Sequence, residues 1–224
     1  MNATGRDGRA AAEGAARPVM ASGRQARTRL ASAAVVGAAH ELFAERGYTA
    51  TTVEEISRRS DVPVATVYRL FSSKLGILTA LIDVAVAGAE GAGRLENQPA
   101  AQALLREPDP ARLLAGFAAI CRQVNVRTAP LYRILDGAAA SGGDAASLLA
   151  ERAKLRDAGQ KQIARALARG GALRRGIRER DAADVIHAVM SPEVFQLLVG
   201  DRGWRPERYE KWLAQTLVDQ LLPK

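Results

Sequence analysis

Cysteine, histidine and aromatic residues are all scarce in this chain of 224 residues. The single cysteine, Cys121, excludes an intrachain disulfide framework and is compatible with a reducing cytoplasm. Together with the only two histidines, His40 and His187, it supplies too few ligands for a conventional zinc cluster. We therefore expect neither a disulfide nor a bound metal ion.

The sequence also lacks the motifs that mark common enzyme classes. It contains no glycine-rich phosphate-binding loop and no nucleophile motif, and its glycines interrupt helical patterns instead. A site built from carboxylates alone would leave no such mark, but nothing in the sequence points to one. We expect no enzymatic activity, no catalytic residues and no cofactor.

Long apolar runs are missing as well. No stretch approaches the roughly 18 consecutive apolar residues of a membrane-spanning helix, and the N-terminus lacks the apolar core of a signal peptide. The net charge of +8 favours a polyanionic partner, either nucleic acid or an anionic membrane. Binding to a membrane surface would need a basic amphipathic helix with bulky apolar residues, which the N-terminal segment lacks. We expect a cytoplasmic protein that binds nucleic acid and no membrane.

Alanine and leucine dominate, and β-branched runs of strand length are almost absent, which predicts an all-α protein. Residues 1–23 are rich in Gly, Ala and Arg without apolar periodicity, and we expect a disordered basic tail there. An alternative is a basic arm, including Arg24, Arg27 and Arg29, that lies along a minor groove. Helical spacing predicts these further helices: 25–46, 64–70, 74–91, 111–126, 129–140, 144–169, 181–199 and 206–222.

A short, well-punctuated segment follows the first of these helices. Gly47 is placed to end that helix, and two overlapping capping boxes, Thr51 with Glu54 and Thr52 with Glu55, begin a helix of about two turns. A tight turn at 60–62 and Pro63 then lead into the next short helix. Two short helices joined in this way form a helix-turn-helix, whose second helix can enter the major groove of DNA.

The residues of this segment resemble the DNA-binding signature of the TetR family. The resemblance covers roughly residues 29–78 and is carried by Leu42 to Tyr48, Thr51 to Val53, Ile56, Val62, Thr66 to Tyr68, Phe71 and Lys74. Asp61 replaces the usual glycine of the turn, and aspartate tolerates the left-handed conformation better than most residues. Pro63 replaces the commoner serine, and Leu70 replaces a His or Tyr that in relatives tends to reach a phosphate.

The resemblance implies a DNA-binding domain over residues 24–74 and a helical domain over 75–224 for ligand binding and dimerisation. It implies a sequence-specific transcriptional regulator, a homodimer that represses from a palindromic operator in double-stranded DNA and is associated with the nucleoid when bound. A small-molecule effector in the C-terminal domain would release it. The alternative is a nonspecific or architectural DNA-binding protein, which would need a basic surface that binds DNA without a fixed position on a particular base sequence.

The resemblance also assigns roles to residues of the DNA-binding domain. Four positions are expected to bind phosphate oxygens: Thr52, Thr66, Tyr68 and Lys74. Arg69 is placed to pair with guanine or, alternatively, to hold a phosphate. Val64 and Ala65 offer only apolar contact, for instance with a thymine methyl group. In the alternative interpretation Thr52 only caps its helix and Tyr68 only packs against the domain.

In the C-terminal domain, the resemblance places a ligand pocket among the helices from about 74 to 169. Bulky or polarisable residues on apolar faces are the candidates for its walls: Phe117, Cys121, Tyr132 and Leu135. Core filling is the alternative for each of them. The last two predicted helices carry apolar seams, and the resemblance implies that they pair with their counterparts across a two-fold axis.

Overall fold

The chain is helical throughout the part that the computed structural model describes, which is residues 17–88, 98–140 and 142–224. No strand occurs within these ranges, so the predicted all-α fold class is confirmed. The N-terminal helices are α1 (Arg17–Ala50), α2 (Val53–Ser60), α3 (Val64–Phe71) and α4 (Lys74–Ala87). They are followed by α5 (Pro99–Leu104), α6 (Pro110–Ala139), α7 (Asp144–Arg169), α8 (Glu179–Val189), α9 (Pro192–Phe195), the π-helix η3 (Gln196–Asp201) and α10 (Pro206–Leu221).

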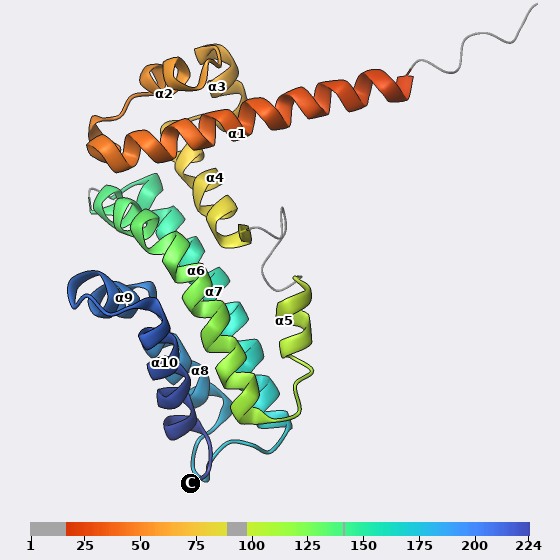
Figure 1. Cartoon of the computed structure of the whole chain (residues 1–224), viewed down its shortest axis with the longest axis vertical. Coiled ribbons are helices and arrows are strands. Elements are labelled where there is room, and N and C mark those ends of the chain that lie inside the picture. Colours follow the sequence, from red (N-terminus) through yellow and green to blue (C-terminus); the bar gives the residue numbers. More distant parts are fainter. Residues whose placement is uncertain (1–16, 89–97, 141) are drawn as a thin grey trace, which may run out of the picture.

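Helix α1 forms a long rod that crosses the top of the molecule in Figure 1. It begins at Arg17, within the segment 1–23 for which a disordered basic tail is predicted, and residues 1–16 lie outside the described residues. Pro18 falls in the first turn, where a proline costs no hydrogen bond. Leu30 is 71% exposed, and from residue 23 onward the first fully buried side chain of the helix is Val35. Gly47 ends the regular helix with φ of 79°, as the sequence predicts.

The helix-turn-helix is built as its sequence indicates. Of the two possible capping boxes, Thr52 with Glu55 forms, and Thr51 is buried instead. The Thr51 hydroxyl lies 2.8 Å from the carbonyl oxygen of Gly47, to which it donates a hydrogen bond that ties the loop to the end of α1. Asp61 adopts the left-handed conformation, with φ of 53°, and closes α2. The prediction that aspartate would preserve this turn is confirmed.

Helices α3 and α4 meet at an angle that brings their backbones very close. The two helices bend by 64° across Ser72 and Ser73. A Cβ atom added at Gly76 would lie only 1.9 Å from the carbonyl oxygen of Phe71. The absence of a side chain at Gly76 therefore allows the first turn of α4 to pack against the end of α3, which fixes how α3 is presented.

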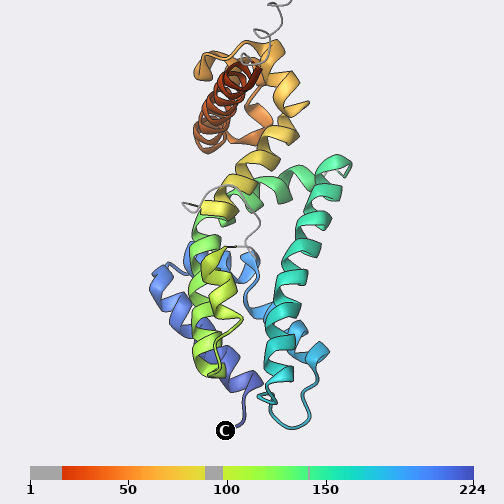
Figure 2. The same cartoon turned by 90° about the vertical axis from the view of Figure 1, so that its right-hand side faces the viewer.

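Two long helices, α6 and α7, form the body of the C-terminal part, and α4 packs against both of them (Figure 2). Helix α6 continues through Pro130, so the prediction of two helices over 111–126 and 129–140 is wrong. Ala129 and Leu131 flank the proline and are both buried, and this packing offsets the lost backbone hydrogen bond. An ion pair between Arg122 and Glu210 links α6 to α10.

The buried apolar residues form two clusters. The first cluster contains side chains of the four N-terminal helices, α1, α2, α3 and α4, and of the neighbouring ends of α6 and α7. The second cluster fills the space between α6, α7, α8 and α10. Helix α4 thus packs in the core of the N-terminal helices and also contacts the C-terminal ones. The domain boundary at residue 74 therefore stays a prediction.

Among the described residues, the helical stretch Glu179–Asp201 is long and apolar enough to cross a membrane by length and composition alone. In its most apolar window, 28% of the residues are buried inside the protein.

Candidate DNA-binding surface and effector cavity

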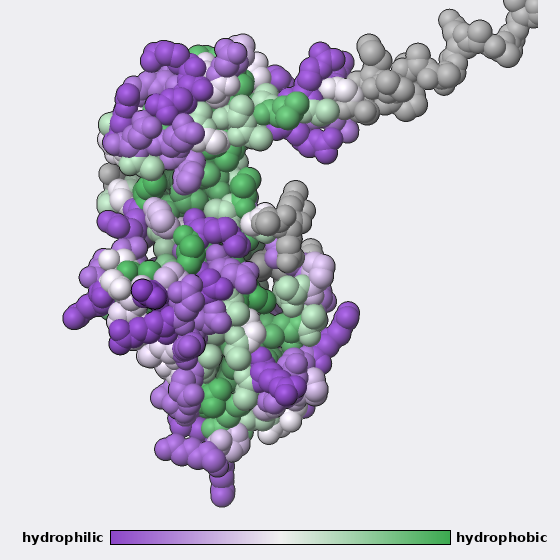
Figure 3. Space-filling model, in the orientation of Figure 1, coloured by the Kyte–Doolittle hydropathy of each residue, from purple (hydrophilic) through white to green (hydrophobic). Residues whose placement is uncertain are grey.

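The outer face of α3 is uncovered. Ala65, Tyr68 and Arg69 are exposed, Tyr68 to 46% of its surface, while Val67 on the opposite face is 1% exposed and packs in the first cluster. The helix therefore divides into an inner apolar face and an outer face that carries a phenol and a guanidinium. Figure 3 shows that the surface over α2 and α3 is largely hydrophilic, whereas apolar residues gather below it around α4.

The other predicted contact residues of this domain are less free than Tyr68 and Arg69. The exposed hydroxyl of Thr52 accepts a hydrogen bond from the Glu55 amide at 3.2 Å and donates one to the Glu55 carboxylate at 3.3 Å. The hydrogen bond from the Thr52 amide holds the pKa of the Glu55 carboxyl below its ordinary value. Val64 and Thr66 are half-buried at the edge of the outer face.

Lys74 points into the domain rather than toward solvent. Its ammonium donates hydrogen bonds to the carbonyl oxygens of Tyr48 at 2.7 Å, Thr49 at 3.4 Å and Thr51 at 2.8 Å. It also lies 4.4 Å from the centre of the Tyr48 ring. Partial burial lowers the pKa of this ammonium. Lys74 thus joins the start of α4 to the loop between α1 and α2. In the predicted phosphate contact, the ammonium N–H groups that bind these carbonyl oxygens would also have to bind a phosphate oxygen.

Most basic residues behind α3 are paired with carboxylates. Arg46 binds Glu55 at 2.8 Å, and Arg59 binds Glu41 at 2.9 Å and Glu45 at 3.1 Å. Arg58, next to Arg59 in the last turn of α2, is exposed as well. Arg58 was not predicted as a DNA-contacting residue from the sequence. Its position just before the turn between α2 and α3 is the signal that could have identified it.

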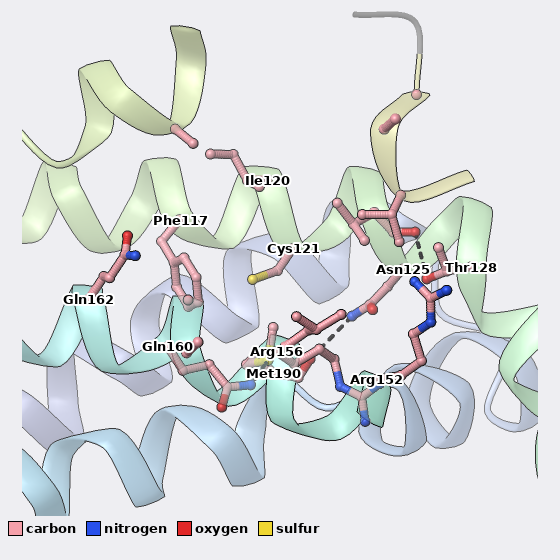
Figure 4. A pocket seen from close by; sticks show the side chains of 18 of the residues that line it. Phe117, Ile120, Cys121, Asn125, Thr128, Arg152, Arg156, Gln160, Gln162 and Met190 are labelled. Atoms are coloured by element: carbon pink, nitrogen blue, oxygen red, sulfur yellow. Dashed lines mark hydrogen bonds between the residues drawn. The ribbon is translucent and has the colours of Figure 1, made fainter. Parts of the chain in front are cut away.

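A cavity of about 870 Å³ lies between α4, α5, α6 and α7 (Figure 4). Three of the predicted wall residues, Phe117, Cys121 and Tyr132, line it. Leu135 does not line it: one turn beyond Tyr132, this residue is fully buried in the first cluster with the N-terminal helices. Burial raises the pKa of the Cys121 thiol, so this side chain acts as an apolar part of the wall.

The polar lining of the cavity was not predicted. It is provided by residues that recur with helical spacing on one face of each long helix: Asn125 and Thr128 on α6, and Arg152, Arg156 and Gln160 on α7. The four-residue spacing on α7, in register with buried Ile163, is the sequence signal that could have found them. Across the described residues, no group of three or more His, Cys, Asp or Glu side chains could hold a metal ion.

Comparison with known proteins agrees with this architecture. Residues 35–81 match the family described as "Bacterial regulatory proteins, tetR family". Over 48 residues the chain is 40% identical to the uncharacterized HTH-type transcriptional regulator YvkB of Bacillus subtilis (strain 168). This match spans 21% of the chain and only a quarter, 25%, of that relative's length.

The solved structures with a similar fold extend the likeness to nearly the whole chain. NalD, the secondary repressor of the MexAB-OprM multidrug efflux pump in Pseudomonas aeruginosa, is 20% identical with a TM-score of 0.65, over 88% of this chain and 98% of NalD. SmeT, the repressor of the Stenotrophomonas maltophilia multidrug efflux pump SmeDEF, is 18% identical with a TM-score of 0.60, over 86% and 91%. The N-terminal segment that carries the helix-turn-helix is therefore similar to the tetR family of bacterial regulatory proteins, and the fold as a whole is similar to that of these repressors.

Proposed function

We propose that this protein is a sequence-specific DNA-binding transcriptional regulator that reads the major groove with α3. The observation that supports this best is the uncovered outer face of α3, where Ala65, Tyr68 and Arg69 stand on a helix whose inner face is fixed in the core. A rigidly held helix with an exposed polar face is what a helix-turn-helix offers to base edges and phosphates. The net charge of +8 favours the same partner.

The proposed regulation is repression that ends when a small molecule occupies the cavity. Helix α4 is the connecting element, because Lys74 at its start contacts the DNA-binding domain, and Asp83 and Ala87 near its end line the cavity. Arg127 of α6 holds that end by donating a hydrogen bond to the carbonyl oxygen of Ala85 at 2.7 Å. A ligand that prefers a different position of α4 shifts the population away from the DNA-binding form. A structure of the similar protein SmeT holds triclosan.

The proposed active species is a homodimer formed through α8, η3 and α10. Apolar side chains on these elements and on the intervening α9 remain partly or largely exposed in the single chain: Val185, Val189, Val194, Leu197, Leu198, Trp212 and Val218. An apolar face of this kind is stabilised by burial against a second copy. A two-fold dimer presents two copies of α3 to an inverted repeat, with half-sites one helical turn or more apart.

The proposal is tested by selecting bound duplexes from a random DNA pool at physiological salt with the full chain. An enriched inverted repeat, bound roughly 10³-fold more tightly than random sequence, is expected. Binding without enrichment would favour the nonspecific or architectural alternative. Absence of binding by folded protein, with carried-over ligand excluded, would reject the proposal.

Arg69 provides the sharpest test of how the sequence is read. Replacing Arg69 by Ala is expected to relax the base preference at one position of each half-site, at a cost of about 1–3 kcal/mol for the preferred base. The measurement is a repeat of the selection together with affinities for single-base variants of the enriched sequence. Arg112→Ala, which removes an exposed arginine of α6, is the control and should change neither. Uniform weakening across all sequences would make Arg69 a phosphate contact instead.

A further inference from the structure

Two arginines of the cavity wall have buried nitrogen atoms without partners. The Nε atom of Arg152 and the Nη1 atom of Arg156 are both shielded from solvent, and neither has a hydrogen-bond partner within the described part of the chain. Both side chains come from α7 and line the cavity between α4 and α6 (Figure 4). A buried guanidinium nitrogen without an acceptor costs free energy, so an acceptor brought in by a ligand would be bound favourably.

The negative charges around this cavity are placed at its rim. Asp83 pairs with Arg152, but its own side chain is 58% exposed, whereas that of Arg152 is 11% exposed. Glu151 is exposed as well. Arg156 lies over the Tyr132 ring, 4.7 Å from its centre, and Asp136, whose carboxyl pKa is raised by burial, is not among the residues that line the cavity. The interior therefore carries more positive than negative charge.

The rest of the wall is apolar. Leu104, Phe117, Ile120 and Ile163 line the cavity toward α5, and Figure 4 shows Phe117 and Ile120 at one end with Thr128 and Arg152 at the other. A volume of about 870 Å³ is sufficient for a drug-sized molecule or a medium-length acyl chain. The cavity thus combines an apolar end with a cationic end.

We infer that the effector of this protein is an organic monoanion with an apolar body, whose charged group binds Arg152 and Arg156. This inference rests on the proposed function, in which the same cavity receives the effector. A carboxylate matches the two arginines in charge and in hydrogen-bonding geometry, because its two oxygens accept from guanidinium N–H groups. The apolar body lies toward Phe117 and Ile120.

The position of Asp83 connects this ligand to regulation. Asp83 belongs to α4 and Arg152 to α7, so their ion pair joins the helix that carries the DNA-binding domain to the cavity wall. The charged group of the ligand competes with the Asp83 carboxylate for Arg152. When the ligand binds, α4 loses this link to α7, and the positions of α4 that do not fit the operator become more populated.

The test uses three probes with the same ten-carbon chain: decanoate, decan-1-ol and decyltrimethylammonium. Their binding to the purified full chain is measured by calorimetry without DNA, below the concentrations at which they aggregate. Decanoate is expected to bind at least tenfold more tightly than either of the other two. Because no DNA is present, this result does not depend on whether the protein represses, which the duplex selection decides separately.

Variants assign the binding to the arginines. Arg156→Met is expected to weaken decanoate binding by about tenfold to a hundredfold and to leave decan-1-ol binding unchanged, since charge-assisted hydrogen bonds are lost while apolar contact is kept. Lys154→Met, an exposed position of the same helix, is the matched control and should bind like the unmodified chain. Circular dichroism establishes that each variant is folded.

Asp83→Asn separates competition from simple charge attraction. It frees Arg152 and is expected to tighten decanoate binding severalfold, whereas Asp219→Asn, which removes an equal charge on α10, should not. The inference is overturned if the protein binds decanoate no more tightly than decan-1-ol, or if it binds neither. Equal decanoate affinity in the Arg156→Met and Lys154→Met variants overturns it as well.

Discussion

Replacing Gly76 by Ala is expected to lower the free energy of unfolding by about 2–3 kcal/mol and to weaken operator binding. The added Cβ would lie 1.9 Å from the Phe71 carbonyl oxygen, and this is a backbone atom that no side-chain rotation can move away. Helix α3 must therefore shift relative to α4, or the first turn of α4 must open. Either change alters the position of the helix that we propose reads DNA.

The matched control for Gly76→Ala is Gly37→Ala. Gly37 lies in α1, and a Cβ atom there would have nothing within 4 Å. This substitution is expected to stabilise the protein by about 0.5–1 kcal/mol, because alanine loses less conformational entropy than glycine in a helix. Urea denaturation followed by circular dichroism measures both variants. Equal stability of the two would contradict the close approach between α3 and α4.

The helix-turn-helix was largely predictable because its signals are local. Gly47, Thr52 and Asp61 each act within a few residues of their own position, through a left-handed φ or a hydrogen bond to a nearby amide. The choice between the two capping boxes was not predictable in the same way. Thr51 is excluded from capping because it is buried against the end of α1, which depends on packing between helices.

The C-terminal part was less predictable because its signals are not local. Proline disfavours a helix interior, yet Pro130 lies within α6 because the residues on both sides are buried against other helices. Leu135 and Tyr132 share an apolar pattern and both pack in the first cluster, but only Tyr132 also borders the cavity, and only the fold shows this difference. The arginines of α7 resemble an ordinary solvated helix face in the sequence, and only the approach of α4 and α6 covers them.

Replacing Lys74 by Met is expected to lower the free energy of unfolding by about 2–3 kcal/mol, since hydrogen bonds from a charged donor are lost in a partly buried place. The ammonium binds the carbonyl oxygens of Tyr48 at 2.7 Å and Thr51 at 2.8 Å, and methionine keeps the apolar stem without these bonds. The loop between α1 and α2 is then held to α4 by fewer contacts. The measurement is urea denaturation, with Lys154→Met as the control for loss of an exposed lysine.

The salt dependence of DNA binding by the same variant decides whether Lys74 also contacts phosphate. Each phosphate contact contributes about one unit to the slope of log affinity against log salt concentration. A slope lower by about one unit in Lys74→Met would support the phosphate contact predicted from the sequence, and the ammonium would then exchange a carbonyl for a phosphate oxygen on binding. An unchanged slope with reduced stability would assign Lys74 to the loop alone. Unchanged stability would contradict the hydrogen bonds of the folded domain, because two carbonyl oxygens would have lost a charged donor without cost.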